Sequence, residues 1–272
     1  MKINKSNASI KKLTITSIVK DDLKRNWELY IMILPVIAYY IIFCYAPMYG
    51  ATISFKDYRA DLGFLGSPWA KPFYKHFKTF FTMPYFWRLL KNTLNISVNT
   101  LIWGFPAPII LALLMNELKS KFFTKVSQTI TYLPYFISTI VICGLIKTFT
   151  AKNGLITSIA VLFGGERVNM LGQQNYFVPI YVISDIWQNI GWNSIIYISA
   201  LAGIDQELYE AAKIDGAGRI KQTWYVTLPG LLPTIIILLI LALGGLLNVG
   251  YEKILNLYNP LTYESADVIS TY

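Results

Sequence analysis

The chain has 272 residues, of which 54% are hydrophobic and only 14% are charged, and its mean hydropathy is +0.45. Soluble domains carry about 25% charged residues, and a single membrane anchor needs only about 20 residues. The net charge of +9 is compatible with nucleic-acid binding, but seven of the 24 Lys and Arg residues precede Trp27 and most others flank apolar runs, where they meet anionic lipid. The composition therefore predicts an all-α, multi-pass integral membrane protein whose surroundings are a lipid bilayer, with no nucleic-acid partner.

The sequence lacks the residues and motifs that several kinds of binding site and catalytic site require. Cys44 and Cys143 lie inside apolar runs and His76 is the single histidine, so a structural disulfide and a metal site are not expected. The phosphate-binding motif Gly-x-x-x-x-Gly-Lys-Ser/Thr is missing, and the glycine pair at 164–165 is only superficially similar to a nucleotide-binding loop. No plausible Ser/His/Asp set is present either. We expect no catalytic residue, no metal and no cofactor, and the chain should not hydrolyse ATP itself.

The N-terminal segment 1–27 is basic, and its loosely spaced apolar residues are typical of a short helix at a membrane interface. We expect this segment in the cytoplasm. Residues 29–55 then form an uncharged run of 27 residues. As a helix this run is about 40 Å long, enough for one tilted span. It is far longer than the apolar region of a signal peptide, so it predicts a retained anchor.

A transmembrane domain is expected over residues 28–272. Three prolines interrupt the segment 56–91, which ends in aromatic and basic residues and is expected at the outer surface. The predicted helices lie at about 29–55, 92–116, 126–147, 177–203 and 230–251. Four spans from a cytoplasmic N-terminus return a polar loop at 204–229 to the cytoplasm. The distribution of Lys and Arg supports this orientation only weakly, with 13 of 24 on the proposed inner side.

The polar loop has clear signals for a short helix. Asp205 is placed to cap the N-terminus, and Glu207 adds negative charge to the first turn, where the helix dipole favours it. Gly216 can adopt the left-handed conformation that ends a helix. A second helical piece is expected from Gly218 to about residue 227, and Pro229 marks the entry to the next apolar run.

The amino-acid sequence of this loop resembles the EAA loop of type I ABC importer permeases, the MetI-like superfamily. That pattern is Glu-Ala-Ala, a later Gly, and then Ile-x-Leu-Pro. Here Gly216 stands one residue further on and Val226 replaces Ile. Segments 105–108, 132–138 and 248–253 look like the LplB-type carbohydrate permeases. The resemblance assigns contact with an ATPase to Glu207, Glu210, Ala211, Ala212, Asp215, Gly216, Ala217, Leu228 and Pro229.

The resemblance implies a permease subunit of an ATP-driven importer for a carbohydrate, expected to be an oligosaccharide, in the cell membrane. It also implies a second, different permease subunit, ATP-binding subunits that supply the ATP, and an extracellular solute-binding lipoprotein. In its mechanism, ATP draws two such loops together and the bundle swings between inward-facing and outward-facing states. LplB-type permeases carry another span after a segment like 259–272, so we expect that a final helix of roughly 20 residues is missing here and that residue 272 lies outside.

Two other function classes remain as alternatives. A self-sufficient secondary transporter or channel is compatible with five apolar spans and a membrane acid such as Asp185. The Glu-Ala-Ala loop argues against it, because an uncoupled carrier has no need of such a motif. A membrane enzyme acting on lipid-linked sugars would need paired carboxylates, and the nearest pair, Asp57 with Asp61, is better explained as a solvated turn.

Two polar stripes in the apolar runs are candidates for the substrate path. In the fourth run, polar residues recur at i, i+3, i+4 and i+7, and in the second run asparagines recur with a similar period above Trp103. Such stripes must face protein or water, because lipid would leave their polar groups unpaired. The candidates are Asp185, Gln188, Asn189, Trp192, Asn95 and Asn99, with Asn92 at the start of the second stripe. The alternative is that these groups hydrogen-bond neighbouring helices and hold the bundle together.

Overall fold

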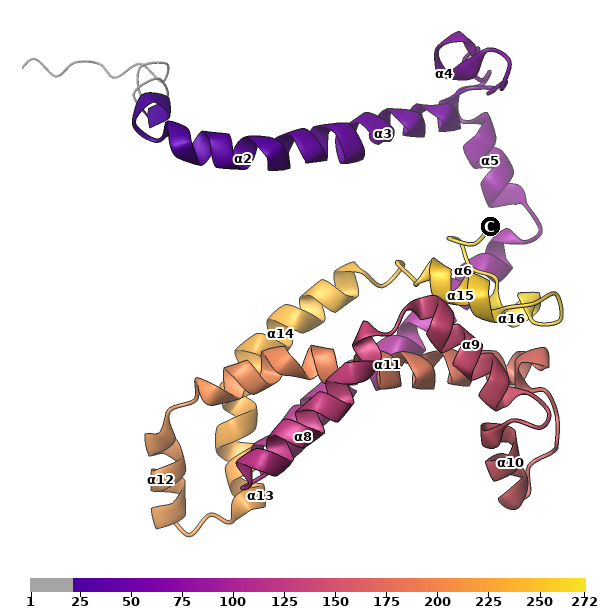
Figure 1. The fold of residues 1–272 in the computed structure, drawn as a ribbon. Helices are drawn as coiled ribbons and strands as arrows, with labels where there is room; N and C mark the ends of the chain where they lie inside the picture. The colour runs from indigo at the N-terminus through magenta and orange to yellow at the C-terminus, as the bar shows by residue number, and fades with distance from the viewer. Residues whose placement is uncertain (1–21) are drawn as a thin grey trace, which may run out of the picture. The chain divides into compact units, whose positions relative to one another are not determined.

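The computed structural model describes residues 22–272, and within this range every regular element is a helix (Figure 1). The all-α prediction is therefore confirmed. Most of the expected N-terminal cytoplasmic segment, residues 1–21, lies outside the described residues. The described part of the chain divides into two compact units, one that ends at Met83 and one formed by residues 84–272, which are described separately.

The main element of the first unit is a long helical run from Trp27 to Phe55, which follows a helical turn at residues 22–25. It consists of α2 (Trp27–Tyr39), a π-helical turn η1 (Tyr40–Tyr45), α3 (Ala46–Met48) and a 3-10 segment η2 (Tyr49–Phe55). No residue in the most apolar window of this run is buried within the chain. Its apolar side chains are suited to lipid or to another protein chain.

A short polar segment completes the first unit, with the helices α4 (Gly63–Gly66) and α5 (Lys75–Thr82). The buried amine of Lys56 donates to the carbonyl of Phe64 at 2.6 Å and lies 5.0 Å from the centre of the Trp69 ring. Lys75 donates to Asp57 at 2.7 Å, and this hydrogen bond lowers the pKa of the Asp57 carboxyl below its ordinary value.

The second unit starts with one helical run from Phe86 to Asn116. It consists of α6 (Phe86–Asn99), a π-helical turn η3 (Thr100–Gly104) and α7 (Pro106–Asn116). The helix begins before the expected residue 92, because the aromatic and basic residues 86–91 form its first turns instead of a separate belt.

The third expected span, 126–147, is not one continuous helix. The chain forms α8 (Lys121–Tyr132), a 3-10 turn η4 (Leu133–Phe136) and α9 (Thr139–Thr150). The backbone is extended at Ile137 and Ser138, and the Ser138 hydroxyl then caps α9. Pro134 has no N–H for the ladder of hydrogen bonds, which explains why the helix stops here. A further helix, α10 (Leu155–Leu162), follows.

The longest helix of the second unit is α11 (Gln174–Ala202), which has 29 residues. It packs against α6, η3, α7, α8 and α14. The chain continues through α12 (Gln206–Ile214), α13 (Arg219–Gln222), a π-helical turn η6 (Thr223–Thr227) and α14 (Leu228–Gly244), and ends with α15 (Tyr251–Leu257) and α16 (Tyr263–Ala266). The last apolar helix thus ends at Gly244, before the expected residue 251.

Four helical runs among the described residues are long and apolar enough to cross a membrane. They are Trp27–Phe55, Phe86–Asn116, Thr139–Leu162 and Arg219–Gly244. The expected fourth span, now α11, has sufficient length but is not among these four. Its polar residues, which include Asp185 and several Asn and Gln, lower its hydropathy.

Two buried clusters lie toward opposite ends of α11. One cluster joins Phe177 and Tyr181 of α11 to α9, α15 and the C-terminal segment. The other joins Tyr197 and Leu201 to Ala112 of α7 and Leu231 of α14. The helix α11 therefore connects the two cores of the second unit.

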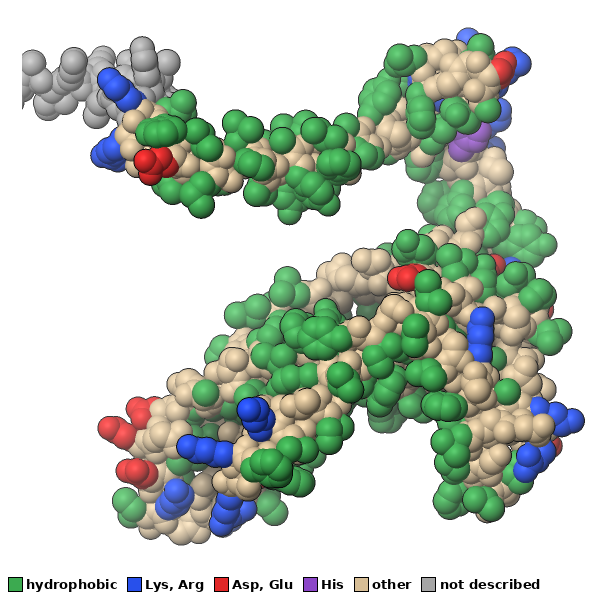
Figure 2. All heavy atoms as spheres, viewed as in Figure 1, with side chains coloured by type: hydrophobic (Ala, Val, Ile, Leu, Met, Phe, Trp, Pro, Cys, Tyr) green, Lys and Arg blue, Asp and Glu red, His purple; other side chains and the backbone are tan. Residues whose placement is uncertain are grey.

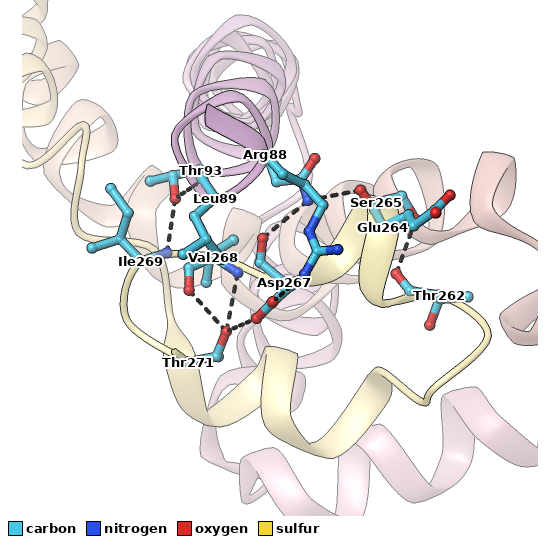
Figure 3. A network of polar contacts seen from close by, with 11 residues as sticks. Arg88, Leu89, Thr93, Thr262, Glu264, Ser265, Asp267, Val268, Ile269 and Thr271 are labelled. Atoms are coloured by element: carbon cyan, nitrogen blue, oxygen red, sulfur yellow. Dashed lines mark hydrogen bonds and ion pairs between the residues drawn. The ribbon is translucent and has the colours of Figure 1, made fainter. Parts of the chain in front are cut away.

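The C-terminal segment is held against the start of α6 by polar contacts (Figure 3). Arg88 pairs with Asp267 at 3.1 Å, and the Thr93 hydroxyl accepts a hydrogen bond from the backbone N–H of Ile269 at 3.1 Å. The buried carboxamide of Asn92 donates to the carbonyls of Glu264 and Asp267 at 2.9 and 3.0 Å. At Asn92 the polar stripe of the second span therefore holds the fold together.

Candidate functional site

The polar loop folds as a capped helix followed by a turn. The Asp205 side chain accepts a hydrogen bond from the backbone N–H of Glu207 at 3.0 Å, so it caps α12 as expected. At the other end Gly216 has a φ of +75°. The N–H of Ala217 bonds the carbonyl of Ala212, and the N–H of Gly216 bonds that of Lys213. This is a Schellman motif, which requires the left-handed conformation that glycine adopts at low cost.

Helix α12 is anchored to the base of α14. The Tyr209 hydroxyl lies 3.1 Å from that of Thr227, and the Gln222 side chain donates to the carbonyl of Ala217 at 2.7 Å. Gly230 lies so close to Ile204 that a Cβ at this position would be 2.8 Å from Ile204 Cδ1. The loop is therefore a folded element with a defined attachment to both α11 and α14.

The outer face of α12 has no partner within the described chain. Leu208 is 54% exposed and Ile214 is 87% exposed, and Figure 2 shows acidic and basic side chains gathered at the end of the second unit that carries α12 and α13. Among the residues predicted for ATPase contact, Glu207, Glu210, Ala211, Asp215, Gly216 and Pro229 are exposed, and Ala212, Ala217 and Leu228 are half-buried. This face offers both charge and apolar surface to another protein.

An ion pair that the sequence pattern does not predict joins α13 to the end of α7. Arg219 lies 3.5 Å from Glu117, and the two side chains are 62% and 47% exposed. Exposed pairs of this kind contribute little to stability. The contact brings the second helical piece of the loop to the turn at 117–120, which precedes α8.

A cavity of about 450 Å³ opens within the second unit. Its wall comes from the run α6–η3–α7, from α11, from α14 and from the turn 245–250. Two of the predicted path residues, Asp185 and Asn189, line it. The Asn189 carboxamide donates to the Asp185 carboxylate at 3.1 Å. The structure thus places the centre of the α11 stripe at a cavity.

Asp185 has a basic partner from a distant part of the chain. The amine of Lys253 in α15 lies 3.4 Å from Asp185 Oδ1 and 5.1 Å from the centre of the Tyr181 ring. The Lys253 side chain is 6% exposed, and that of Asp185 is 27% exposed. The sequence pattern marks the segment 248–253 but does not pair its lysine with the acid, because no local spacing relates the two residues.

The other predicted path residues do not line this cavity. Trp192 stacks on Tyr135 with ring centres 4.5 Å apart and an interplanar angle of 3°, so one of its faces is already covered. Asn99 donates to Asn95 at 2.9 Å and, with Trp103, lines a separate and largely apolar hollow. Gln188 also lies outside the lining. The structure therefore does not bring the two stripes together at one cavity.

Comparisons with known proteins place these features in context. A family model described as "Binding-protein-dependent transport system inner membrane component" matches residues 104–249. The polygalacturonan/rhamnogalacturonan transport system permease protein YteP of Bacillus subtilis (strain 168) is 44% identical over 245 residues, which cover 90% of this chain and 76% of YteP. Protein LplB of the same organism is 43% identical over 251 residues, covering 92% of this chain and 78% of LplB.

A similar solved structure is a chain of a bacterial ABC transporter involved in the import of the acidic polysaccharide alginate. The TM-score is 0.84 at 44% sequence identity, and the match covers 94% of this chain and 85% of the other. A second structure of the bacterial alginate ABC transporter, in complex with an alginate pentasaccharide-bound periplasmic protein, matches with a TM-score of 0.82.

Proposed function

Because the chain belongs to the family of binding-protein-dependent transport system inner membrane components, we propose that it is the permease subunit of an ATP-driven carbohydrate importer. The carbohydrate is an oligosaccharide. Support comes from YteP, which is named for polygalacturonan and rhamnogalacturonan, and from the structurally similar alginate transporter. The chain is a multi-pass membrane protein.

The observation that carries the proposal is the folded loop with its unpartnered outer face. Two separate ATP-binding subunits dock on the pair of such loops in the assembled importer, one on each permease, and they bind the ATP. Glu210 offers charge and Leu208 and Ile214 offer apolar surface to the docked subunit. A second, different permease completes the pathway, and an extracellular solute-binding lipoprotein delivers the sugar. The loop and the N-terminus both face the cytoplasm.

The path from the loop to the cavity runs through packed side chains. Helix α12 is bonded to Thr227 at the base of α14, and the buried cluster around Leu201 and Leu231 joins α11 to α14. Both helices continue to the cavity wall. A displacement of α12 by the ATPase therefore biases the arrangement of the wall between two states.

The sugar passes the cavity beside Asp185 and Asn189. Polar groups in a lipid-embedded bundle are expensive unless they are paired, so the polar side chains on this otherwise largely apolar cavity wall are suited to contact with a hydrophilic solute. Gln188, Trp192, Asn95 and Asn99 are not part of this proposal, because they do not line the cavity.

The test is uptake by the reconstituted importer. The chain is co-expressed with its candidate partner genes, and the purified complex is placed in vesicles with ATP inside and sugar-loaded binding protein outside. We expect sugar accumulation that requires both ATP and the binding protein. Accumulation by vesicles that contain the chain without ATP-binding subunits would instead favour a self-sufficient transporter.

A further inference from the structure

Apart from Tyr181 and Tyr197, the polar side chains on the cavity wall fall into two groups according to their hydrogen bonds. Asp185 and Asn189 are hydrogen-bonded to each other, and Asp185 also accepts a hydrogen bond from Lys253. A second group has no hydrogen-bond partner for its side-chain polar atoms anywhere in residues 22–272. Its members are Ser97, Thr100, Asn193 and Asn248.

The two hydroxyls of this group differ from other buried hydroxyls in α6 and α11. Thr93 donates to the carbonyl of Leu89 at 2.7 Å, and Ser184 donates to that of Tyr181 at 2.9 Å. This back-bonding is the usual arrangement within a helix. Ser97 is 8% exposed, yet its Oγ and the Oγ1 of Thr100 accept and donate no hydrogen bond within the described chain. Buried polar atoms without a partner carry a desolvation cost, which a ligand hydroxyl group can offset once a change of side-chain rotamer turns the oxygen toward the cavity.

The four side chains come to the wall from three parts of the chain. Ser97 and Thr100 lie at i and i+3, on one face of the first helical run of the second unit. Thr100 opens the π-helical turn η3, and single π-helical turns inside α-helices occur frequently at functional sites. Asn193 stands one turn after Asn189 in α11, and Asn248 lies in the turn that follows α14. Both asparagines are exposed, so a ligand can reach them.

The chemistry of this group indicates what it binds. Hydroxyls and carboxamides both donate and accept hydrogen bonds, as sugar hydroxyls do. The lining contains no Lys, Arg or His, and its one charged residue is Asp185, which is paired with Lys253. We propose that Ser97, Thr100, Asn193 and Asn248 form an uncharged subsite that binds hydroxyl groups of the translocated sugar. The inference rests on the proposed function, and it assigns any carboxylate of an acidic sugar to a surface other than this wall.

The experiment uses the complete importer in vesicles and a panel of radiolabelled probes: maltotriose, arabinotriose, trigalacturonate and an alginate trisaccharide. The probe that the wild-type importer accumulates is then given to the double variant Ser97→Ala/Thr100→Val and, separately, to Asn193→Leu. We expect uptake by the double variant at subsaturating probe to fall about 10-fold, the effect of losing two hydrogen bonds. Monodeoxy analogues of the probe are tested as well. For an analogue that lacks the contacted hydroxyl, wild type and variant should transport equally.

Ser184→Ala is the matched control, because it removes a buried hydroxyl that already has a carbonyl partner and does not line the cavity. It should retain uptake. The Tm of the double variant should equal or exceed that of the wild type, since it removes hydroxyls without partners. Unchanged uptake, or a loss that is equal for all deoxy analogues and accompanied by a lower Tm, would overturn the subsite. If the wild-type importer accumulates no sugar of any kind, the proposed carbohydrate function itself fails, which is a different result.

Discussion

The amine of Lys253 lies 3.4 Å from the carboxylate of Asp185, although the two residues are 68 positions apart in the chain. The pair joins α15 to the middle of α11 at the edge of the cavity. The carboxylate is partly exposed to the cavity, whereas the amine is almost completely buried. The two partners therefore differ in what happens when the other is removed.

We expect Asp185→Asn to destabilise the chain more than Lys253→Met does. The first change leaves a buried ammonium without its counter-ion and should cost about 3 kcal/mol, while the second leaves a carboxylate that cavity water can solvate and should cost about 1 kcal/mol. The measurement is the Tm of the purified importer complex in detergent. Equal shifts for the two variants would contradict the asymmetric burial. The double variant should recover part of the loss, because neither charge then remains unpaired.

Gly216→Val should abolish sugar-stimulated ATPase activity while the complex still assembles in the membrane. The positive φ of Gly216 disfavours a β-branched side chain by about 1–2 kcal/mol, so the Schellman turn and the orientation of α12 change. Gly218→Ala is the control, since Gly218 has a φ of −68° and a Cβ added there would meet no heavy atom within 4 Å. If Gly216→Val retains full stimulation, the turn is not needed for coupling.

Glu210→Lys should reduce the stimulated ATPase rate without lowering the Tm. Glu210 is exposed and forms no ion pair within residues 22–272, so the substitution alters only what α12 presents to a partner. Glu166→Lys makes the same charge change at an exposed site between α10 and α11 and should have no effect. Equal stimulation in the two variants would remove Glu210 from the docking face.

Trp192→Ala should lower stability and leave sugar selectivity unchanged. The indole stacks on Tyr135 and meets Phe136 edge-on at 5.7 Å, and these contacts connect α11 to the 3-10 turn η4. Their loss should cost about 1 kcal/mol beyond the lost apolar area. Uptake competition among the panel sugars, compared with a Trp192→Phe control that keeps a ring, distinguishes the roles. A change in the preferred sugar would return Trp192 to the substrate path.

Asn92→Leu should loosen the C-terminal segment. The variant leaves the carbonyls of Glu264 and Asp267 without their donor, at a cost of about 1–3 kcal/mol. Limited proteolysis should then cleave within residues 259–272 faster than in the wild type. Asn95→Leu is the control, because the Asn95 side chain bonds only Asn99, on the exposed side of the same helix. Equal protection of both variants would show that Asn92 does not fasten the segment.

The features that the sequence predicted well depend on neighbouring residues. Asp205 caps α12 through a residue two positions away, and the Gly216 turn is closed by bonds within five residues. All the residues that such a cap or turn requires lie within a few positions of one another in the sequence. The helix class follows in the same way from long apolar runs, which can satisfy their backbone groups in lipid only as helices.

The features that the sequence did not reveal depend on distant residues. Arg88 meets Asp267 across 179 positions, and Asp185 meets Lys253 across 68. The helical periodicity identified the polar face of α11, but it did not show which residues of that face line the cavity. It therefore grouped Asp185 and Asn189, which line the wall, with Trp192, which does not. In α6 the regular spacing of the asparagines predicted Asn95 and Asn99 as path residues, whereas the cavity is lined by Ser97 and Thr100, which were not predicted.

The last apolar helical run begins in the polar loop at one end and contributes to the cavity wall near its other end. From Arg219 to Gly244 it has 26 residues, which corresponds to about 39 Å of helix. Pro229 and Pro233 each remove a backbone hydrogen bond from the part of this helix nearer the loop, directly after the π-helical turn η6. Because the missing hydrogen bonds weaken the helix near the loop, we expect it to bend there, and such a bend would shift Leu238 and Ala242 on the cavity wall relative to α13.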